Sequence, residues 1–193
     1  MRDWTHYEVR FGAVGGQGVI LAGAILADAA VFYEGLQAVQ SPQYTPQVRG
    51  GATKVDVIID TKEIIYPQSD LLDFFLSMSQ RAYDRYVIDT KPEGMILIEP
   101  SLVNNYAKAP AKVYAMPIIA LTKKEVGKMV MSSVVALGAM VAMSKVVEED
   151  SIRKAVLKNA PKGTEQLNLK ALSIGLEWGE KMLKEGPVYV PSN

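Results

Sequence analysis

The sequence predicts an α/β fold, with helices on both faces of a mixed, mostly parallel sheet and a helical C-terminal part. Three observations carry this prediction. Strand-like and helix-like apolar segments alternate through most of the chain. A glycine-rich turn joins the first strand-like segment to an apolar helix-like segment. The chain has 193 residues, 49% of them hydrophobic, which suits a single domain over residues 1–193 with its core at residues 8–185.

The individual elements follow from local patterns. Residues 8–14 end at the glycines as a first strand, and Val19–Tyr33 is rich in Ala, Leu and Ile without proline, as a buried helix is. Residues 52–59 alternate and then become apolar, and Glu63–Tyr66 is expected to pair with them as a hairpin. The other expected strands are 36–39, 71–78, 95–98 and 112–115, and the other expected helices are 80–86, 132–146, 151–157 and 164–184, with 116–126 partly helical.

The end of the chain breaks this pattern. Residues 186–193 are too rich in proline for a helix. We expect this C-terminal arm to be disordered or to lie on a partner chain.

The composition excludes several classes of function. The formal net charge is zero, which argues against a general electrostatic grip on nucleic acid or anionic lipid. There is no cysteine, so the chain cannot hold an iron–sulfur cluster or a zinc ion through thiolates, and a reducing, cytoplasmic location is expected. His6 is the only histidine, which argues against Ser-His-Asp chemistry and multi-histidine metal sites.

Two segments bear on secretion and membranes. Residues 1–6 lack the apolar centre of a signal peptide. Met129–Met143 is the most apolar run, but it is shorter than the roughly 20 residues that a membrane helix needs, and it contains Ser132 and Ser133. We therefore expect a buried core helix there and no membrane partner.

The first candidate site comprises Gly15, Gly16, Gln17 and Gly18. A glycine turn between a strand and a helix exposes backbone N–H groups at a helix N-terminus, where those groups and the helix dipole suit an anion. The pattern departs from a dinucleotide fingerprint, because its third glycine position falls on Leu21 and the second strand leads to Gln40 and Ser41 without a carboxylate for a ribose. Phosphate binding and a plain packing turn both remain open, and Gln17 either reaches a ligand or caps the helix.

The second candidate site lies in the polar loop before residue 52. Its candidate residues are Tyr44, Arg49, Gly50 and Gly51. In a doubly wound fold this loop follows the second strand and can lie beside the glycine turn. Arg49 can make a two-pronged contact with a carboxylate or phosphate, and the paired glycines let a backbone approach closely. A solvated surface loop is the alternative.

Together the two stretches resemble a known family. Gly15–Val19 with its Ala/Leu helix, followed by Arg49-Gly50-Gly51 before a strand, is similar to the gamma subunit of 2-oxoacid:ferredoxin oxidoreductases, in the pyruvate ferredoxin oxidoreductase family. The likeness continues through Glu63–Pro67, where the family often has a short strand ending in proline, and through Leu137–Ala139 in a late helix. It covers nearly the whole chain.

The resemblance implies a subunit of a larger enzyme. Such enzymes decarboxylate a 2-oxoacid with thiamine diphosphate, pass electrons through iron–sulfur clusters to ferredoxin and release an acyl-CoA. The gamma chain is then expected to be a three-layer, Rossmann-like domain near the place where coenzyme A approaches. Alpha and beta subunits, with a ferredoxin-like delta subunit in some complexes, would hold thiamine diphosphate, Mg²⁺ and [4Fe-4S] clusters. Both candidate sites would face coenzyme A or a partner, with no catalytic residue in this chain, and the isolated chain would be inactive.

The arginine loop bears on the choice of oxoacid. The pyruvate branch more often has Arg-Arg-Gly-Ala-Pro-Val, whereas Val48–Thr53 has one arginine before two glycines, as in the 2-oxoglutarate and branched-chain branches. We therefore favour 2-oxoglutarate, with the small subunit of indolepyruvate oxidoreductase as an alternative. Many relatives also have Gly-Asn where Gly127 is followed by Lys128 here, so a ligand role of that asparagine does not carry over. A free-standing Rossmann-like nucleotide-binding protein and a small independent enzyme are the alternatives of other classes.

Overall fold

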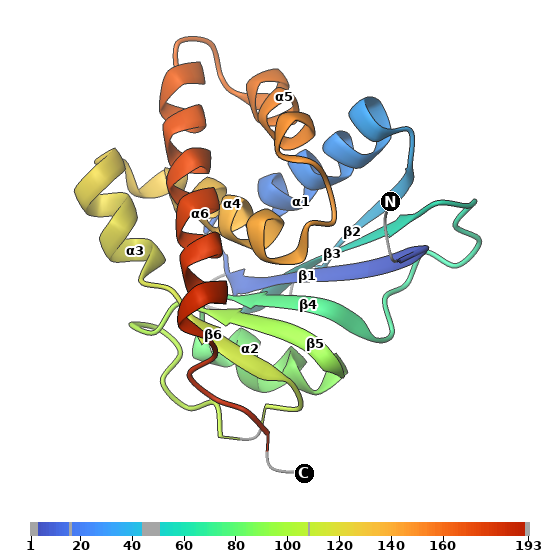
Figure 1. The fold of residues 1–193 in the computed structure, drawn as a ribbon, viewed down its shortest axis with the longest axis vertical. Helices are drawn as coiled ribbons and strands as arrows, with labels where there is room; N and C mark the ends of the chain where they lie inside the picture. The colour runs from blue at the N-terminus through green and yellow to red at the C-terminus, as the bar shows by residue number, and fades with distance from the viewer. Residues whose placement is uncertain (1–3, 16, 44–50, 108, 192–193) are drawn as a thin grey trace.

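The computed structural model describes residues 4–15, 17–43, 51–107 and 109–191. A six-stranded sheet in the order β2-β3-β1-β4-β5-β6 has α2 on one face and α1, α4, α5 and α6 on the other, which confirms the predicted three-layer α/β fold (Figure 1). The strands are β1 (His6–Val14), β2 (Gln37–Gln43), β3 (Ala52–Asp60), β4 (Leu72–Ser77), β5 (Thr90–Ile98) and β6 (Lys112–Ala115). The α-helices are α1 (Val19–Asp28), α2 (Gln80–Tyr86), α3 (Ile118–Leu121), α4 (Ser132–Ser144), α5 (Glu149–Asn159) and α6 (Glu165–Glu185).

The sheet is mixed because β3 runs against both of its neighbours. β1, β4, β5 and β6 pair in parallel, whereas β3 pairs antiparallel with β1 on one side and with β2 on the other. The hairpin predicted for Glu63–Tyr66 is wrong, as is the short strand expected before Pro67. Both edges of β3 are already taken, so no edge remains for a hairpin partner.

Residues 61–71 instead form an irregular segment, here called the strap. The strap touches β2, where the Ser41 hydroxyl donates to the Pro67 carbonyl, and β1, where the Ser69 hydroxyl donates to the Glu8 carboxylate. Ile65 in the strap is 92% exposed, so this isoleucine is not buried as an apolar residue of a central strand would be.

The second strand is longer than expected and contains Pro42. Proline has no backbone N–H and is accepted in a strand only where that donor is not needed. β2 is the edge of the sheet, so Pro42 costs it no bond to a neighbour on the open side.

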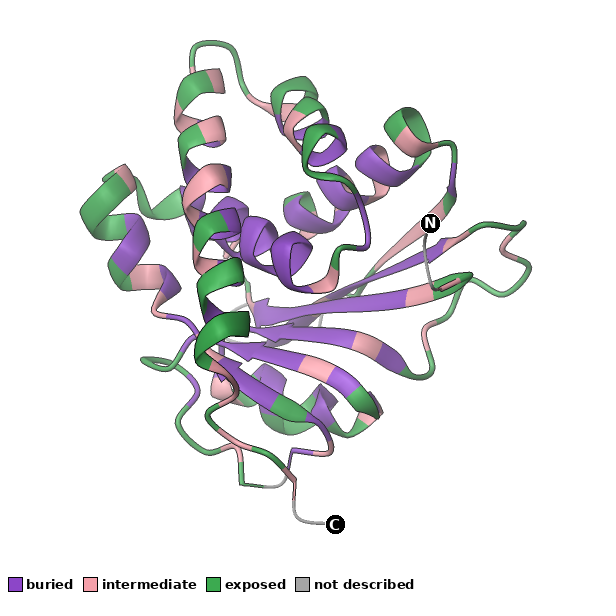
Figure 2. Ribbon diagram, in the orientation of Figure 1, coloured by how far each residue is buried: buried purple, intermediate pink, exposed green. Residues whose placement is uncertain are grey.

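The central strand β4 is buried on both faces, as parallel strands between helices usually are (Figure 2). Phe74 and Leu76 pack in the cluster beneath α1 and α4, while Leu72 and Phe75 pack in the cluster beneath α2. This double burial accounts for the nearly continuous apolar run at residues 71–78.

The apolar run near residue 132 is the buried core helix that the sequence predicts. Residues 132–143 of α4 are all buried, and α4 lies against α6 (Figures 1 and 2). Glycines let the two backbones meet: a Cβ atom on Gly138 would lie 2.4 Å from the Leu172 carbonyl oxygen, and one on Gly175 would lie 2.1 Å from the Val135 oxygen. The Leu137–Ala139 motif is thus a helix-packing contact.

None of the helices in the described part of the chain is long and apolar enough to cross a membrane.

The described part of the C-terminal arm, residues 186–191, lies on the chain's own sheet. The Val188 N–H donates to the Val113 carbonyl at 2.8 Å, and the Tyr189 carbonyl accepts from the Val113 N–H at 3.0 Å. The Tyr189 hydroxyl also donates to the Ala107 carbonyl at 2.9 Å. For these residues the expectation of disorder is wrong, because the open edge of β6 offers backbone donors and acceptors to a nearby segment. A contact of the arm with a partner chain stays a prediction.

Candidate functional site

The glycine turn connects the end of β1 to α1 and is closed by Gln17. The Gln17 side-chain oxygen accepts from the Val14 N–H at 2.9 Å, and its amide nitrogen donates to the Met78 carbonyl at 3.2 Å. This side chain therefore fastens the turn to the end of β4. It does not cap α1, whose first turn has no side-chain cap.

Gly18 meets two requirements that a residue with a side chain would not meet. Its φ of 74° lies in the left-handed region, and a Cβ atom there would lie 2.8 Å from the Ser133 hydroxyl oxygen of α4. Gly15, in contrast, is exposed and has open space around its Cα. The turn is thus a packed junction between α1 and α4 at Gly18 and an open surface at Gly15.

The second candidate site is placed only in part. Tyr44, Arg49 and Gly50 lie outside the described residues, as does Gly16 of the first candidate site, so their interpretation stays a prediction. Gly51 is buried at the start of β3. The register pair Val14–Ala52 puts Gly51 at the same end of the sheet as Gly15, so these two candidate glycines lie at one end of the sheet.

A cavity of about 320 Å³ adjoins the glycine turn; we call it the Met129 pocket. Met129 is 44% exposed and Val130 is 71% exposed. The sequence assigned the whole run from Met129 to Met143 to packing, which is wrong for these two residues, because they precede α4 in a short 3₁₀ turn. The lining residues are Gln17, Met78, Ile119, Met129, Val130 and Ser132.

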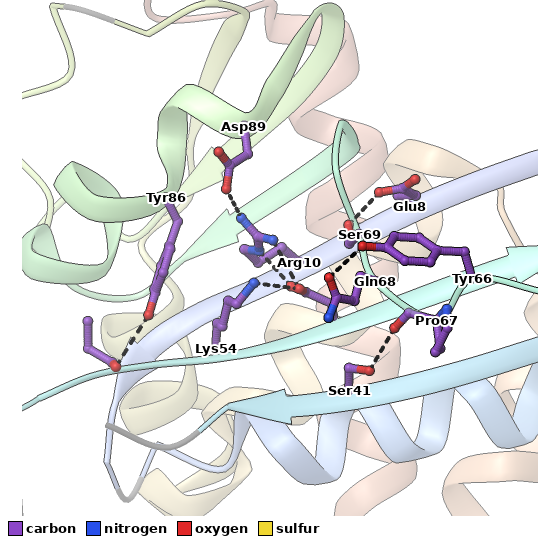
Figure 3. Close-up of polar contacts among 12 residues, drawn as sticks. Glu8, Arg10, Ser41, Lys54, Tyr66, Pro67, Gln68, Ser69, Tyr86 and Asp89 are labelled. Carbon is purple, nitrogen blue, oxygen red and sulfur yellow. Dashed lines mark hydrogen bonds and ion pairs between the residues drawn. The ribbon is translucent and has the colours of Figure 1, made fainter. Parts of the chain in front are cut away.

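A buried ion cluster lies on the α2 side of β1, opposite the side on which Val9 and Phe11 pack with α1 and α4 (Figure 3). Arg10 is 1% exposed, and its guanidinium makes a two-pronged contact with Asp56, at 2.5 Å from Nε and 2.9 Å from Nη2. Its Nη1 donates to Asp89. Lys54 Nζ lies 2.7 Å from the same Asp56 carboxylate. Burial disfavours the charge of Arg10, but the bonds to the two carboxylates outweigh it and raise the pKa of the guanidinium.

A second cavity, of about 350 Å³, opens beside this cluster between β2, β3 and the strap; we call it the Lys54 pocket. The sequence analysis did not single out this place, where Asp56 is buried. The one signal of this pocket in the sequence was the spacing of Lys54 and Asp56, which are two positions apart and so lie on the same face of a strand. The lining residues are Ser41, Pro42, Gln43, Lys54, Asp56, Pro67, Gln68 and Ser69.

The described residues contain no group of three or more His, Cys, Asp or Glu side chains placed to hold a metal ion. Two carboxylates elsewhere in the chain, Asp28 and Glu34, have structural partners. Asp28 accepts from the Asn159 amide at 2.9 Å, and Glu34 accepts from the Glu148 N–H at 2.5 Å.

Comparison with known proteins gives consistent matches over almost the full length. Residues 8–178 match the family model described as pyruvate ferredoxin/flavodoxin oxidoreductase. The chain is 37% identical to 2-oxoglutarate synthase subunit KorC of Methanocaldococcus jannaschii, over 91% of this chain and 95% of that one.

Two solved structures have the same fold. The gamma subunit of a keto/oxoacid ferredoxin oxidoreductase from Geobacter sulfurreducens PCA is 40% identical, covers 93% of this chain and 99% of its own, and superposes with a TM-score of 0.86. A 2-oxoglutarate:ferredoxin oxidoreductase from Magnetococcus marinus is 19% identical and matches 99% of this chain with 34% of its own length, at a TM-score of 0.80. The resemblance to gamma subunits is confirmed, and the chain belongs to the pyruvate ferredoxin/flavodoxin oxidoreductase family.

Proposed function

We propose that this chain is the gamma subunit of a 2-oxoacid:ferredoxin oxidoreductase that converts 2-oxoglutarate to an acyl-CoA and reduces ferredoxin. The observation that carries the proposal is the near full-length similarity to a subunit named for 2-oxoglutarate synthase. The single arginine before Gly50 and Gly51, read from the sequence, favours the same branch. The proposed unit is one gamma-type domain over the whole chain, acting in the cytoplasm.

The proposed division of labour follows from what the chain contains. Without cysteine it has no thiolates for a [4Fe-4S] cluster, and its described residues contain no group of three or more His, Cys, Asp or Glu side chains placed to hold a metal ion. Alpha and beta subunits, with or without a ferredoxin-like delta subunit, would hold thiamine diphosphate, Mg²⁺ and the clusters. This chain would contribute a surface that contacts the other subunits and one side of the coenzyme A site.

The part of this chain proposed to face coenzyme A is the glycine turn with the Met129 pocket. The uncapped N-terminus of α1 presents backbone N–H groups, and Met129 and Val130 add exposed apolar surface. That combination suits the phosphate and apolar parts of coenzyme A, or an apolar segment of a partner subunit. Lys128, exposed next to Met129, adds a positive charge.

The first test is purification of the tagged chain from its own cells without oxygen. We expect a brown multi-subunit complex that reduces viologen with 2-oxoglutarate and coenzyme A, and much less with pyruvate, branched-chain oxoacids or indolepyruvate. Preference for indolepyruvate would move the assignment to that branch. A colourless lone chain that binds NAD, ATP or coenzyme A in calorimetry would contradict the subunit role and favour a free-standing nucleotide-binding protein.

The second test changes Gln17 in the complex. Gln17→Ala removes the partners of the Val14 N–H and the Met78 carbonyl, so the turn should shift and the KM for coenzyme A should rise by about tenfold, the effect of roughly 1.4 kcal/mol. Assembly should be retained, as judged by the mass of the complex. Gln37→Ala, at an exposed glutamine of β2, is the matched control and should behave like the unchanged complex. An unaltered KM in Gln17→Ala would remove the glycine turn from the coenzyme A site.

A further inference from the structure

The face of the sheet that carries α2 is apolar on one half and ionic on the other. Phe75 and the other residues beneath α2 form an apolar cluster on the β4–β5 side. On the β3–β2 side, the register aligns Arg10, Asp56 and Ser41 in one row across three strands. Tyr86 at the end of α2 reaches the Arg10 end of this row, and its ring centroid lies 5.4 Å from the Arg10 guanidinium carbon and 5.6 Å from the Lys54 ammonium. The Lys54 pocket lies beside the row and is lined by Asp56 and Ser41 (Figure 3).

The charges around this pocket leave one cation with spare donors. Asp56 accepts from Arg10 through both oxygens and from Lys54 through one, so a single carboxylate serves two cations. Asp89 balances Arg10 from the other side. The Lys54 ammonium has three N–H donors, and one hydrogen bond to it is present among the described residues. Two donors therefore remain on a side chain that is only 17% exposed.

The remaining walls add neutral donors. The amide groups of Gln43 and Gln68 line the pocket. The Gln68 oxygen already accepts from the Tyr66 hydroxyl at 2.7 Å, so its amide nitrogen is the group left for another molecule. The hydroxyls of Ser41 and Ser69 are turned to Pro67 and Glu8, and they fix the strap over the pocket (Figure 3).

We propose that the Lys54 pocket binds a carboxylate group. Arg10 and Lys54 together balance Asp56 and Asp89, so one added negative charge is opposed less there than the two charges of a phosphate dianion, and the two remaining Lys54 donors can bind it. The side-chain amides of Gln43 and Gln68 can donate further hydrogen bonds to the planar carboxylate of the ligand. The carboxylate belongs either to a free small dicarboxylate or to an acidic side chain of a partner subunit; both sources present the same chemistry.

The purified full-length chain tests the binding itself. Titration with succinate, followed by amide NMR, should shift the signals of Ser41, Gln43 and Lys54 saturably. Lys54→Met should weaken the affinity by about tenfold or more, because a hydrogen bond to a charged group is lost. Inorganic phosphate should bind more weakly than succinate. Lys170→Met, at an exposed lysine of α6, should leave binding unchanged.

Some outcomes would overturn the proposal. These are absence of saturable shifts together with normal assembly of a Lys54→Met complex, or equal succinate affinity in the unchanged chain and in Lys54→Met. If Lys54→Met does not fold, Gln68→Ala at an exposed strap residue replaces it, with an expected loss of about threefold, and unchanged affinity there overturns the proposal equally.

The assembled complex separates the two sources. Succinate shifts that persist in the complex identify a free dicarboxylate. Loss of those shifts, combined with at least tenfold weaker association of the Lys54→Met subunit with its partners, identifies a partner carboxylate.

Discussion

The charge of His6 is set by what its two ring nitrogens face. Nδ1 lies 2.8 Å from an Asp60 oxygen and Nε2 lies 2.9 Å from a Glu8 oxygen. Because an ionised carboxylate only accepts, both contacts are hydrogen bonds only when both nitrogens carry a proton. Partial burial disfavours that charge, but the bonds to Glu8 and Asp60 outweigh it and raise the pKa of His6.

The free energy of unfolding should therefore fall as the pH rises through the pKa of His6. The contribution of the imidazolium to the free energy of unfolding is complete below the ordinary histidine pKa of about 6.5, and it is lost as pH rises through the raised value. The ring is 43% exposed, so the contribution stays below about 1 kcal/mol. Because His6 is the only histidine, its ring proton NMR signals report its titration directly. Asp60→Asn should lower the pKa of His6, whereas Glu180→Gln on α6 should not. A His6 pKa of 6.5 or less in the unchanged chain would refute this assignment.

At the scale of elements, the contact between α4 and α6 depends on missing side chains. Ordinarily Gly→Ala in a helix is favourable by up to about 1 kcal/mol. At Gly175 the added Cβ would lie 2.1 Å from the Val135 carbonyl oxygen, so the helices must separate, and we expect Gly175→Ala to lower the free energy of unfolding by about 2–3 kcal/mol. Urea unfolding measures this. Lys170→Ala, on the exposed side of α6, should stay within about 0.5 kcal/mol of the unchanged chain. A more stable Gly175→Ala protein would show that the two helices lie further apart.

At the scale of the whole molecule, the C-terminal arm protects one edge of the sheet. Removing residues 186–193 takes away the pairing of Val188 and Tyr189 with Val113. The freed edge of β6 offers unpaired backbone groups to another copy, so we expect the shortened chain to self-associate with rising concentration. Sedimentation velocity at matched concentrations tests this. Tyr189→Phe removes only the hydroxyl bond to Ala107 and should sediment as the unchanged chain does. Identical sedimentation of the shortened chain would show that the edge is protected by other means.

The sequence predicted what depends on near neighbours and missed what depends on distant ones. Strand and helix periodicity, the glycine turn and the buried helix at residue 132 are local signals, and the structure confirms them. The insertion of β3 between β1 and β2 is a tertiary choice, so the hairpin prediction failed. The Arg10 cluster joins residues 46 and 79 positions apart, and no local pattern encodes such a pairing. Gln17 was recognised as important, but its bond to Met78, 61 positions away, was equally invisible.

The position of β3 also sets the order in which this sheet can form during synthesis. When the ribosome has made residues 1–51, β1 and β2 both exist, but the sheet leaves a strand-wide gap between them. β3 must then enter that gap and pair along both of its edges at once, with residues up to 54 positions upstream on β1. Such non-local pairing is slow, and until it occurs the nascent chain carries two strands with open edges. The first sixty residues are therefore the part of this chain most exposed to aggregation before folding is complete.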